Sequence, residues 1–342
     1  MFHHKYLKYK TKYLQLKILQ EGGKREKTYH VNMGDKDFEK IIIQKLEKRK
    51  FVKGDKPPFT FIFVTHEAAF QRNSFNSMGS NWINLIQGES KDLITNKIEL
   101  HKKFNESNFM KKALFLNSQD KNKMKEEVKD LEDSYRILKP LKGYKGKGIK
   151  VVSNKKDMID WIENNKEYED WIVEDYIESP DLVDSYKFHL RVYILVVVRG
   201  NKSAEVYVSF KKFYVRALEK YKKEDWDNKS IHDTHFKDSI KMISFDEKLP
   251  DNWEEKDRDN ANKKINEIIK EIFSSNLKFW QEWRSKNSFE VFGADVIFEN
   301  KQPKILEINA KMAWFPRTAE IIDPLLDIVL DRKQNKEFYK IY

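Results

Sequence analysis

The sequence predicts a mixed fold, α/β or α+β, and two observations support this expectation. From about residue 31 onward, amphipathic patterns typical of helices alternate with short apolar runs typical of strands. Hydrophobic residues, 39% of the chain, and aromatic residues, 13%, are spread along it, as in a folded protein. At 342 residues the chain is long enough for two or three packed sub-domains.

The individual elements follow from periodicity and turn residues. Helices are expected at 37–49, 90–105, 121–132, 155–165, 260–285 and from about 319 onward. Strands are expected at 59–65, 135–140, 148–153, 169–177, 187–198, 203–216, 289–298 and 304–309. The stretch 219–260 is strongly charged and irregular, and no internal repeat is present.

Composition excludes several functions. The chain has no cysteine, which excludes disulfides, thiol catalysis and thiolate metal sites. The longest apolar run, Val192 to Val198, is far shorter than a membrane span, so we expect a soluble protein. The net charge of +11 raises the question of nucleic acid, but residues 1–30 carry more than half of it. We therefore expect no specific nucleic-acid partner.

The first twenty residues predict a basic amphipathic helix rather than a signal peptide. Phe2, Tyr6, Tyr9, Tyr13 and Leu16 form one stripe, and lysines occupy the other faces. Such a helix is either a solvated tail or a segment that contacts a membrane surface or a partner. The stretch also resembles the Tyr/Lys-rich leaders of many giant-virus proteins, which would place the protein in the host cytoplasm.

Three of the chain's 11 glycines fall in the short loop of "KPLKGYKGKGIKVV": Gly143, Gly146 and Gly148. A strand, a glycine- and lysine-rich loop and a second strand can fold over phosphates, with backbone N–H groups and lysines as donors. The candidate lysines are Lys139, Lys142, Lys145 and Lys147. The spacing matches neither a Walker A nor a Rossmann motif, so an ordinary exposed hairpin remains the alternative.

The strand in "SYKFHLRVYILVVV" carries three basic residues on one face. Alternation points Phe188, Leu190, Val192 and Ile194 to one side and Lys187, His189 and Arg191 to the other. A row of basic side chains on an otherwise apolar strand indicates an anion or a reaction site.

Two strands near the C-terminus predict a cluster of oxygen ligands. With "ENKQP" (299–303) as a hairpin loop, pairing of 298 with 304 sets Asp295 opposite Glu307. Glu307 and Asn309 share a face, and Leu306 and Ile308 occupy the other. Two carboxylates and an amide oxygen suit Mg²⁺; the alternative is a solvated or salt-bridged strand face.

Taken in order, these motifs resemble the tubulin–tyrosine ligase-like family of the ATP-grasp superfamily, over residues 80–315. The similarity lies in "KP…KGKGI", "DWIVEDYIESPDLVDSYKFHLRVYILVV", "IHDTH" and "GADVIFE…ILEIN", with a fainter match in "NLIQGESKDLITNK". The resemblance implies an ATP-grasp fold in which two α/β subdomains sandwich the nucleotide. The implied division is a tail and linker (1–30), an N-terminal α/β domain (31–110), a central subdomain (111–180) and a C-terminal subdomain (181–342).

The resemblance also implies a function. It implies ATP- and Mg²⁺-dependent carboxylate–amine ligation through an acyl phosphate, which adds tyrosine, glutamate or glycine to an acidic, tubulin-like protein tail. The protein would be a cytoplasmic monomer, with a free amino acid as its second substrate. Family positions carry over as catalytic Arg191, Arg216, His189, His232 and Thr234; nucleotide-binding Lys97, Lys139, Lys145, Gly146, Glu174, Asp175, Ile177 and Lys187; and metal-binding Asp295, Glu307 and Asn309.

Two positions depart from the family pattern. His189 replaces the Asp of the K-F-D-L-R strand, and His235 replaces the Asn of H-x-T-N. His189 could act as a hydrogen-bond partner or base, or it could mark a degenerate site. The rival hypothesis is therefore a catalytically impaired ATP-grasp protein that binds nucleotide and a cytoskeletal or other partner. A zinc site of His189, His232 and His235 is a further alternative.

Overall fold

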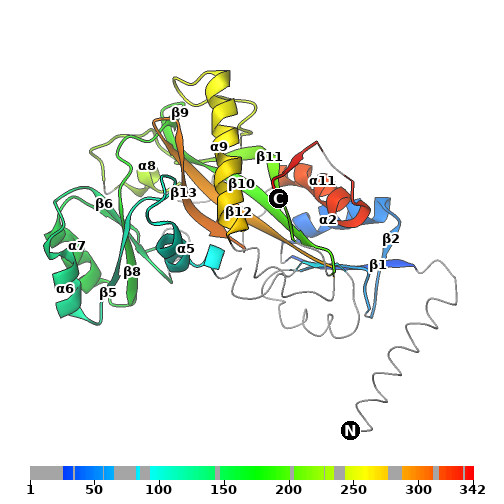
Figure 1. Cartoon of the computed structure of the whole chain (residues 1–342), viewed down its shortest axis with the longest axis horizontal. Coiled ribbons are helices and arrows are strands. Elements are labelled where there is room, and N and C mark those ends of the chain that lie inside the picture. Colours follow the sequence, from blue (N-terminus) through cyan, green and yellow to red (C-terminus); the bar gives the residue numbers. More distant parts are fainter. Residues whose placement is uncertain are drawn as a thin grey trace, which may run out of the picture.

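The computed structural model contains two β-sheets with helices packed against them (Figure 1). It describes residues 26–33, 35–56, 58–64, 82–84, 93–142, 147–200, 204–226, 228–234, 243–275, 287–310, 316–333 and 336–342. The expected mixed helix-and-strand class is confirmed as α+β. The predicted tail helix lies outside the described residues.

The large sheet is built around two long central strands. Its ten strands are β1 (Lys27–Asn32), β2 (Phe51–Lys53), β3 (Phe61–Val64), β4 (Ile83–Asn84), β9 (Leu182–Val183), β10 (Tyr186–Val198), β11 (Glu205–Arg216), β12 (Ser288–Glu299), β13 (Gln302–Asn309) and β14 (Phe338–Lys340). The main order is β14-β11-β10-β12-β4-β3-β1-β2, with β13 paired to β12 and β9 to β10. Strands β1 to β4 pair in parallel, whereas β9 to β14 pair antiparallel. The N-terminal strands therefore extend the sheet that carries β10.

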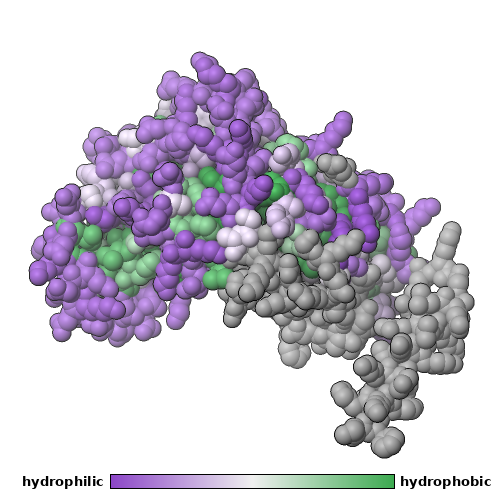
Figure 2. Space-filling view, in the orientation of Figure 1, coloured by the Kyte–Doolittle hydropathy of each residue, from purple (hydrophilic) through white to green (hydrophobic). Residues whose placement is uncertain are grey.

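The small sheet is antiparallel, in the order β5-β8-β6-β7. Its strands are β5 (Ala113–Asn117), β6 (Arg136–Pro140), β7 (Lys150–Val152) and β8 (Asp170–Asp175). Helices α6 (Lys121–Lys129) and α7 (Lys155–Asn164) pack against it through Met124, Val128, Met158 and Ile162. Figure 2 shows apolar residues reaching the surface over this sheet, whereas the face over α9 is mainly hydrophilic.

Helices cover both faces of the large sheet. The 20-residue helix α9 (Glu255–Ser274) packs its isoleucines on the face that carries Phe188 and Leu190. Helix α2 (Lys36–Lys48), the 3₁₀ turn η3 (Pro316–Ile321), α11 (Ile322–Leu326) and the π-helical turn η4 (Asp327–Asp331) lie against the other face, with Tyr193 and Leu195. Because both faces are covered, every residue of β10 after Tyr186 is buried.

Most predicted elements are confirmed, with shifted ends. Helix α9 begins before the expected residue 260 because Glu254 and Asp257 form a capping box, and the expected continuation to 285 falls largely outside the described residues. Within the expected 90–105 helix, residues 93–95 are helical, the helix is interrupted at Asn96, and α5 (Lys97–Phe104) follows with Asn96 as its cap; residues 90–92 lie outside the described residues. The helix expected from about 319 is confirmed but begins earlier: residues 316–331 are helical without a break, as the successive 3₁₀, α and π segments η3, α11 and η4.

The predicted five-residue hairpin loop between β12 and β13 is wrong. Glu299 pairs with Gln302, so the turn contains only Asn300 and Lys301, both with positive φ (53° and 62°). A bulge beside Asp295 then shifts the register by one residue. Asp295 consequently lies opposite Glu307, as the sequence predicted.

Among the described residues, no helix is long and apolar enough to cross a membrane.

A charged network links the N-terminal helix α2 to the C-terminal segments α11 and η4. Arg49, which follows α2, contacts the carboxylates of Asp323 and Asp327 at 2.6 Å each, and Lys45 also contacts Asp323. Partial burial raises the pKa of Asp323, but the hydrogen bonds from Lys45 and Arg49 outweigh it and lower that pKa overall.

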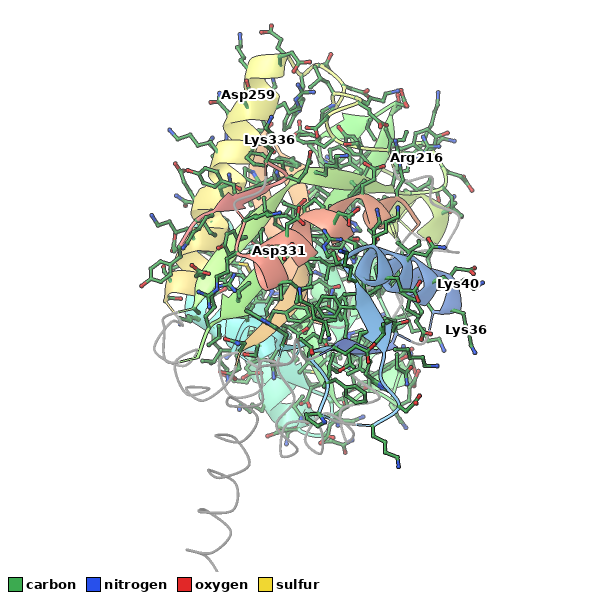
Figure 3. The ribbon with its side chains drawn as sticks, turned by 90° about the vertical axis from the view of Figure 1, so that its right-hand side faces the viewer. Lys36, Lys40, Arg216, Asp259, Asp331 and Lys336 are labelled. Atoms are coloured by element: carbon green, nitrogen blue, oxygen red, sulfur yellow. The ribbon has the colours of Figure 1, made fainter. Side chains whose placement is uncertain are left out.

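We expect Arg49→Met to lower the free energy of unfolding by about 1–2 kcal/mol at neutral pH, because it removes charge-assisted hydrogen bonds to two carboxylates. The lowered pKa of Asp323 means that this stabilisation is present above its unfolded pKa and fades as the pH falls. Denaturant unfolding across acid and neutral pH measures both effects. Lys36→Met, on the exposed start of α2 (Figure 3), is the control and should change stability by less than about 0.5 kcal/mol.

Candidate active site

A cleft of about 600 Å³ lies between the two sheets. Its walls come from β6, β7 and β8 of the small sheet and from β10, β12 and β13 of the large sheet. Helix α5 and the segment around α8 (Lys229–His232) complete it. The lining residues combine apolar side chains with basic and carboxylate groups, the usual composition of a ligand site.

The basic face of β10 forms the floor of the cleft, as the alternation predicted. Lys187, His189 and Arg191 line it, whereas Leu190, Val192 and Ile194 belong to the α9 core; Phe188 packs in that core and also reaches the cleft lining. His189 is fully buried, and Lys187 and Arg191 are 6% and 4% exposed. Three buried basic groups on one strand need anionic or polar partners.

Asp295 supplies one of these partners directly across the sheet. It lies opposite Arg191 on β10 and opposite Glu307 on β13, so the three side chains form a row on one face. The Arg191 Nε atom is 2.6 Å from Asp295 Oδ1 and its Nη2 atom is 3.3 Å from Oδ2. The Arg191 Nη1 atom is buried and has no hydrogen-bond partner among the residues that the structure describes. An anionic oxygen in the cleft would satisfy it.

Glu307 and Asn309 complete the predicted oxygen cluster. The Asn309 amide donates to Glu307 Oε1 at 2.6 Å, and Lys97 Nζ lies 3.0 Å from Glu307 Oε2. Leu306 was expected on the opposite face, but the bulge turns it into the cleft beside Glu307. Within the described residues no group of three His, Asp or Glu side chains is arranged to hold a metal. His235 lies outside the described residues.

His189 contacts two elements of the site. Its Nδ1 atom is 2.8 Å from the Thr234 hydroxyl, and its Nε2 atom is 3.4 Å from Asp295 Oδ1. His189 therefore connects the segment after α8 to the carboxylate on β12. The structure brings together three residues that sequence reasoning had assigned to catalysis or metal binding.

Glu174 on β8 anchors the small-sheet wall. Its carboxylate is 2.7 Å from Lys139 Nζ on β6 and 3.3 Å from His101 Nε2 on α5. Burial raises the pKa of Glu174, but Lys139 and His101 outweigh it and lower the pKa to about 2. Because α5 also carries Lys97, this helix contacts Glu174 on one sheet and Glu307 on the other.

Tyr176 and His232 form a polar chain beside Lys187. The Tyr176 hydroxyl is 2.8 Å from Lys187 Nζ and 2.7 Å from His232 Nδ1, and His232 Nε2 is 2.9 Å from the Asp225 carbonyl. Burial, the nearby Lys187 charge and only weaker opposing contacts lower the pKa of His232 to about 4. His232 is therefore neutral at pH 7.

Of the remaining predicted site residues, some line the cleft and others do not. Asp175 and Ile177 line the cleft, and Asp175 also accepts from Arg136 at 2.7 Å. Arg216 does not line the cleft; it lies opposite Phe188 in the β10–β11 ladder, and its guanidinium stacks 4.2 Å from the Tyr186 ring centre. Figure 3 shows it near the edge of the molecule. Lys145 and Gly146 lie outside the described residues.

Sequence reasoning missed His101, Tyr176 and Trp226. His101 lies four residues after Lys97 and so shares its helix face, a signal that was available. Tyr176 lies between the two predicted residues Asp175 and Ile177. Trp226 lies in the charged, irregular stretch 219–260, and no periodic pattern there indicates that it lines the cleft.

The fold and the cleft together define a class: α+β proteins that gather cations and carboxylates in a cleft between two sheets. The family model described as the tubulin-tyrosine ligase family matches residues 78–339. The chain therefore belongs to the tubulin-tyrosine ligase family.

Curated relatives are similar at low identity. A probable tubulin polyglutamylase of Caenorhabditis elegans is 25% identical over 52% of this chain and 46% of its own length. A tubulin glycylase, 3D, of Tetrahymena thermophila is 30% identical over 64% of this chain and 22% of its own length. A probable tubulin–tyrosine ligase of Saccharomyces cerevisiae is 25% identical over 58% of this chain and 32% of its own length. The chain spans less than half the length of these relatives.

We expect Glu174→Gln to lower the free energy of unfolding by about 2–4 kcal/mol at pH 7, because it leaves Lys139 and His101 without their shared buried carboxylate. The lowered pKa means that the carboxylate stabilises the fold above pH ~4.5 and loses this effect as the pH falls toward ~2. The difference in free energy of unfolding between the wild type and Glu174→Gln should therefore be smaller at pH 3 than at pH 7, as measured by urea unfolding at both pH values. A difference that stays constant over this range contradicts the assignment.

Proposed function

We propose that the protein is an ATP- and Mg²⁺-dependent carboxylate–amine ligase with an ATP-grasp fold, which adds an amino acid to an acidic protein tail. The observation that carries this proposal is one cleft in which Lys187 and Arg191 face the cluster of Asp295, Glu307 and Asn309. Cations suited to phosphate and oxygen ligands suited to Mg²⁺ meet there from three adjacent strands. Family membership supports the same reading.

The cleft residues fit a nucleotide with its metal. Lys187 is buried without an ion-pair partner within the described part of the chain, and Arg191 has a free buried N–H group. Lys139, Lys97 and the lysines of the glycine loop around Lys145 and Gly146 would add charge around the phosphates. Glu174, Asp175 and Ile177 would contact the base at the small-sheet wall. Asp295, Glu307 and Asn309 would hold the metal.

Bound ATP would supply the phosphoryl group that activates a carboxylate, and Mg²⁺ would neutralise the phosphate charge. The chain's own contribution is to position and to exclude water. Arg191 has a planar donor group suited to phosphoryl oxygens, and Asp295 fixes its orientation. His189 and Thr234 hold the edge of the site next to Asp295, and Arg216 would contribute only if it reached the cleft from its present position.

We propose a tubulin-like acidic tail as the acceptor, together with a free amino acid. The relatives are named for tubulin modification with glutamate, glycine or tyrosine. The modest positive charge that remains on the chain beyond residue 30 is compatible with approach of an acidic segment. We expect the protein to act in the cytoplasm as a monomer, divided at residues 30, 110 and 180, with residues 1–20 available for a membrane-surface or partner contact.

The test is incubation of the purified chain with Mg·ATP, tubulin and a pool of amino acids. The expected result is release of ADP together with a mass increase of tubulin. Glu307→Gln should lower the rate by about 100-fold or more, because loss of a metal ligand weakens both metal binding and phosphate neutralisation. Asp259→Asn on the exposed surface of α9 (Figure 3) should leave the rate unchanged. Turnover that is equal in all three proteins would contradict the assignment.

A second candidate function is nucleotide binding without turnover, and the buried position of His189 favours it. His189 stands where the family has Asp, and it contacts Asp295, so the site has one carboxylate fewer near the metal ligands. This candidate predicts that the wild-type chain and His189→Asp both bind Mg·ADP with Kd values within about threefold and that neither hydrolyses ATP. Calorimetry and an ADP-release assay measure the two properties. Activity that appears in His189→Asp would contradict this candidate.

A further inference from the structure

Lys187 is a buried amine that faces the cleft without a neutralising partner. Its side chain is 6% exposed, and its hydrogen-bond partner is the Tyr176 hydroxyl at 2.8 Å. The ammonium nitrogen also lies 4.4 Å from the centre of the Tyr176 ring. Within the described residues no carboxylate lies within ion-pair distance of it. The protein therefore holds this amine by a neutral contact.

The Asp225 carbonyl at one end of the hydrogen-bonded series Asp225–His232–Tyr176–Lys187 determines which group donates in each bond. The Asp225 backbone carbonyl can only accept, so His232 carries its proton on Nε2. His232 Nδ1 then accepts from the Tyr176 hydroxyl, which also hydrogen-bonds to Tyr221; the Tyr221 hydroxyl donates its own proton to the Glu178 carbonyl. The Tyr176 oxygen is left to accept from Lys187, in either charge state of the amine.

Aromatic side chains pack against His232 in this hydrogen-bonded series. Trp226 stacks on His232 at 5.3 Å and 22°, and its ring also contacts Tyr135 at 4.1 Å. The edge of Tyr221 lies against His232 at 5.6 Å. Because two aromatic rings pack against His232, its Nδ1 atom is a positioned partner for the Tyr176 hydroxyl, whose oxygen accepts from Lys187.

The groups that face Lys187 compensate its charge only in part. Tyr176 and His232 are neutral at pH 7, Lys139 on β6 is a like charge, and Asp233 after α8 is the opposing carboxylate. Burial and the charge of Lys139 lower the pKa of Lys187 to about 7, and the attraction of Asp233 offsets this only in part. Near neutral pH the amine is thus close to half protonated.

We propose that binding of a nucleotide polyphosphate in the cleft is coupled to proton uptake by Lys187, with Tyr176 and His232 as positioning residues that hold the amine without neutralising it. The inference rests on the proposed function, because it needs a polyphosphate in the cleft. The amine lone pair forms a new N–H bond with a proton from solvent, and the resulting ammonium pairs with a phosphate oxygen. Affinity is then highest below pH ~7 and falls as the pH rises, because the free protein must first take up the proton.

The test is isothermal titration calorimetry of the full chain with Mg·ADP, in two buffers of different ionisation enthalpy at each pH. From a free pKa of about 7, the expected uptake is roughly 0.1 proton per ADP at pH 6 and roughly 0.9 at pH 8. Lys187→Arg, which stays charged, and Lys187→Met, which stays neutral, give the uptake that comes from ADP itself. The predicted signal is a larger number of protons taken up per ADP at pH 8 by the wild type than by either variant.

Tyr176→Phe tests the positioning role. It removes the acceptor that favours the charged amine, so the pH at which uptake reaches half should move down by about 0.5–1. Tyr135→Phe keeps the aromatic stack and lies outside the hydrogen-bond chain, so it should leave that midpoint unchanged. Binding with equal uptake in the wild type and the Lys187 variants overturns the inference alone. No binding of Mg·ADP at either pH overturns the proposed function, and the inference with it.

Discussion

The contact between Arg191 and Asp295 is the interaction on which the rest of the site depends. Arg191 on β10, Asp295 on β12 and Glu307 on β13 are direct neighbours in two successive strand pairs, so one register sets all three. That register is held by the apolar residues between them, because slipping a strand by one residue would exchange its core and cleft faces. The packing of α9 and α2 on opposite faces therefore determines which charges meet in the cleft.

In the structure, three acidic groups of the cleft are already matched by cations of the same chain. Asp295 pairs with Arg191, Glu307 with Lys97, and Glu174 with Lys139. Lys187 differs, since its partner is a neutral hydroxyl. An anionic ligand would therefore gain most at Lys187 and at the unpaired N–H of Arg191, and a divalent cation at Glu307 would have to replace Lys97. Helix α5 is the element that such a replacement would disturb.

Local patterns predicted much of the fold and the large-sheet half of the site. Alternation alone separated Lys187 and Arg191 in the cleft from Leu190 in the core, and the two-strand pattern near the C-terminus set Asp295 opposite Glu307. That second result came through a wrong loop length, since the shorter turn and the bulge at Leu306 compensate each other; a bulge depends on tertiary packing and leaves no periodic signal. The contact of Lys97 with Glu307 and the place of Trp226 arise between segments far apart in sequence, and no local pattern encodes them. Arg216 shows the converse: its strand was predicted, but its side chain lies on Tyr186 outside the cleft.

The measurement that tests this account most directly is a crystal structure of the full chain grown with Mn²⁺ and ADP, with the metal located by its anomalous signal. The account predicts manganese bound by Asp295, Glu307 and Asn309, Lys97 moved away from Glu307, and the diphosphate within hydrogen-bond distance of Lys187 and Arg191. Metal and nucleotide bound elsewhere, with the Lys97–Glu307 and Arg191–Asp295 pairs intact, would contradict it.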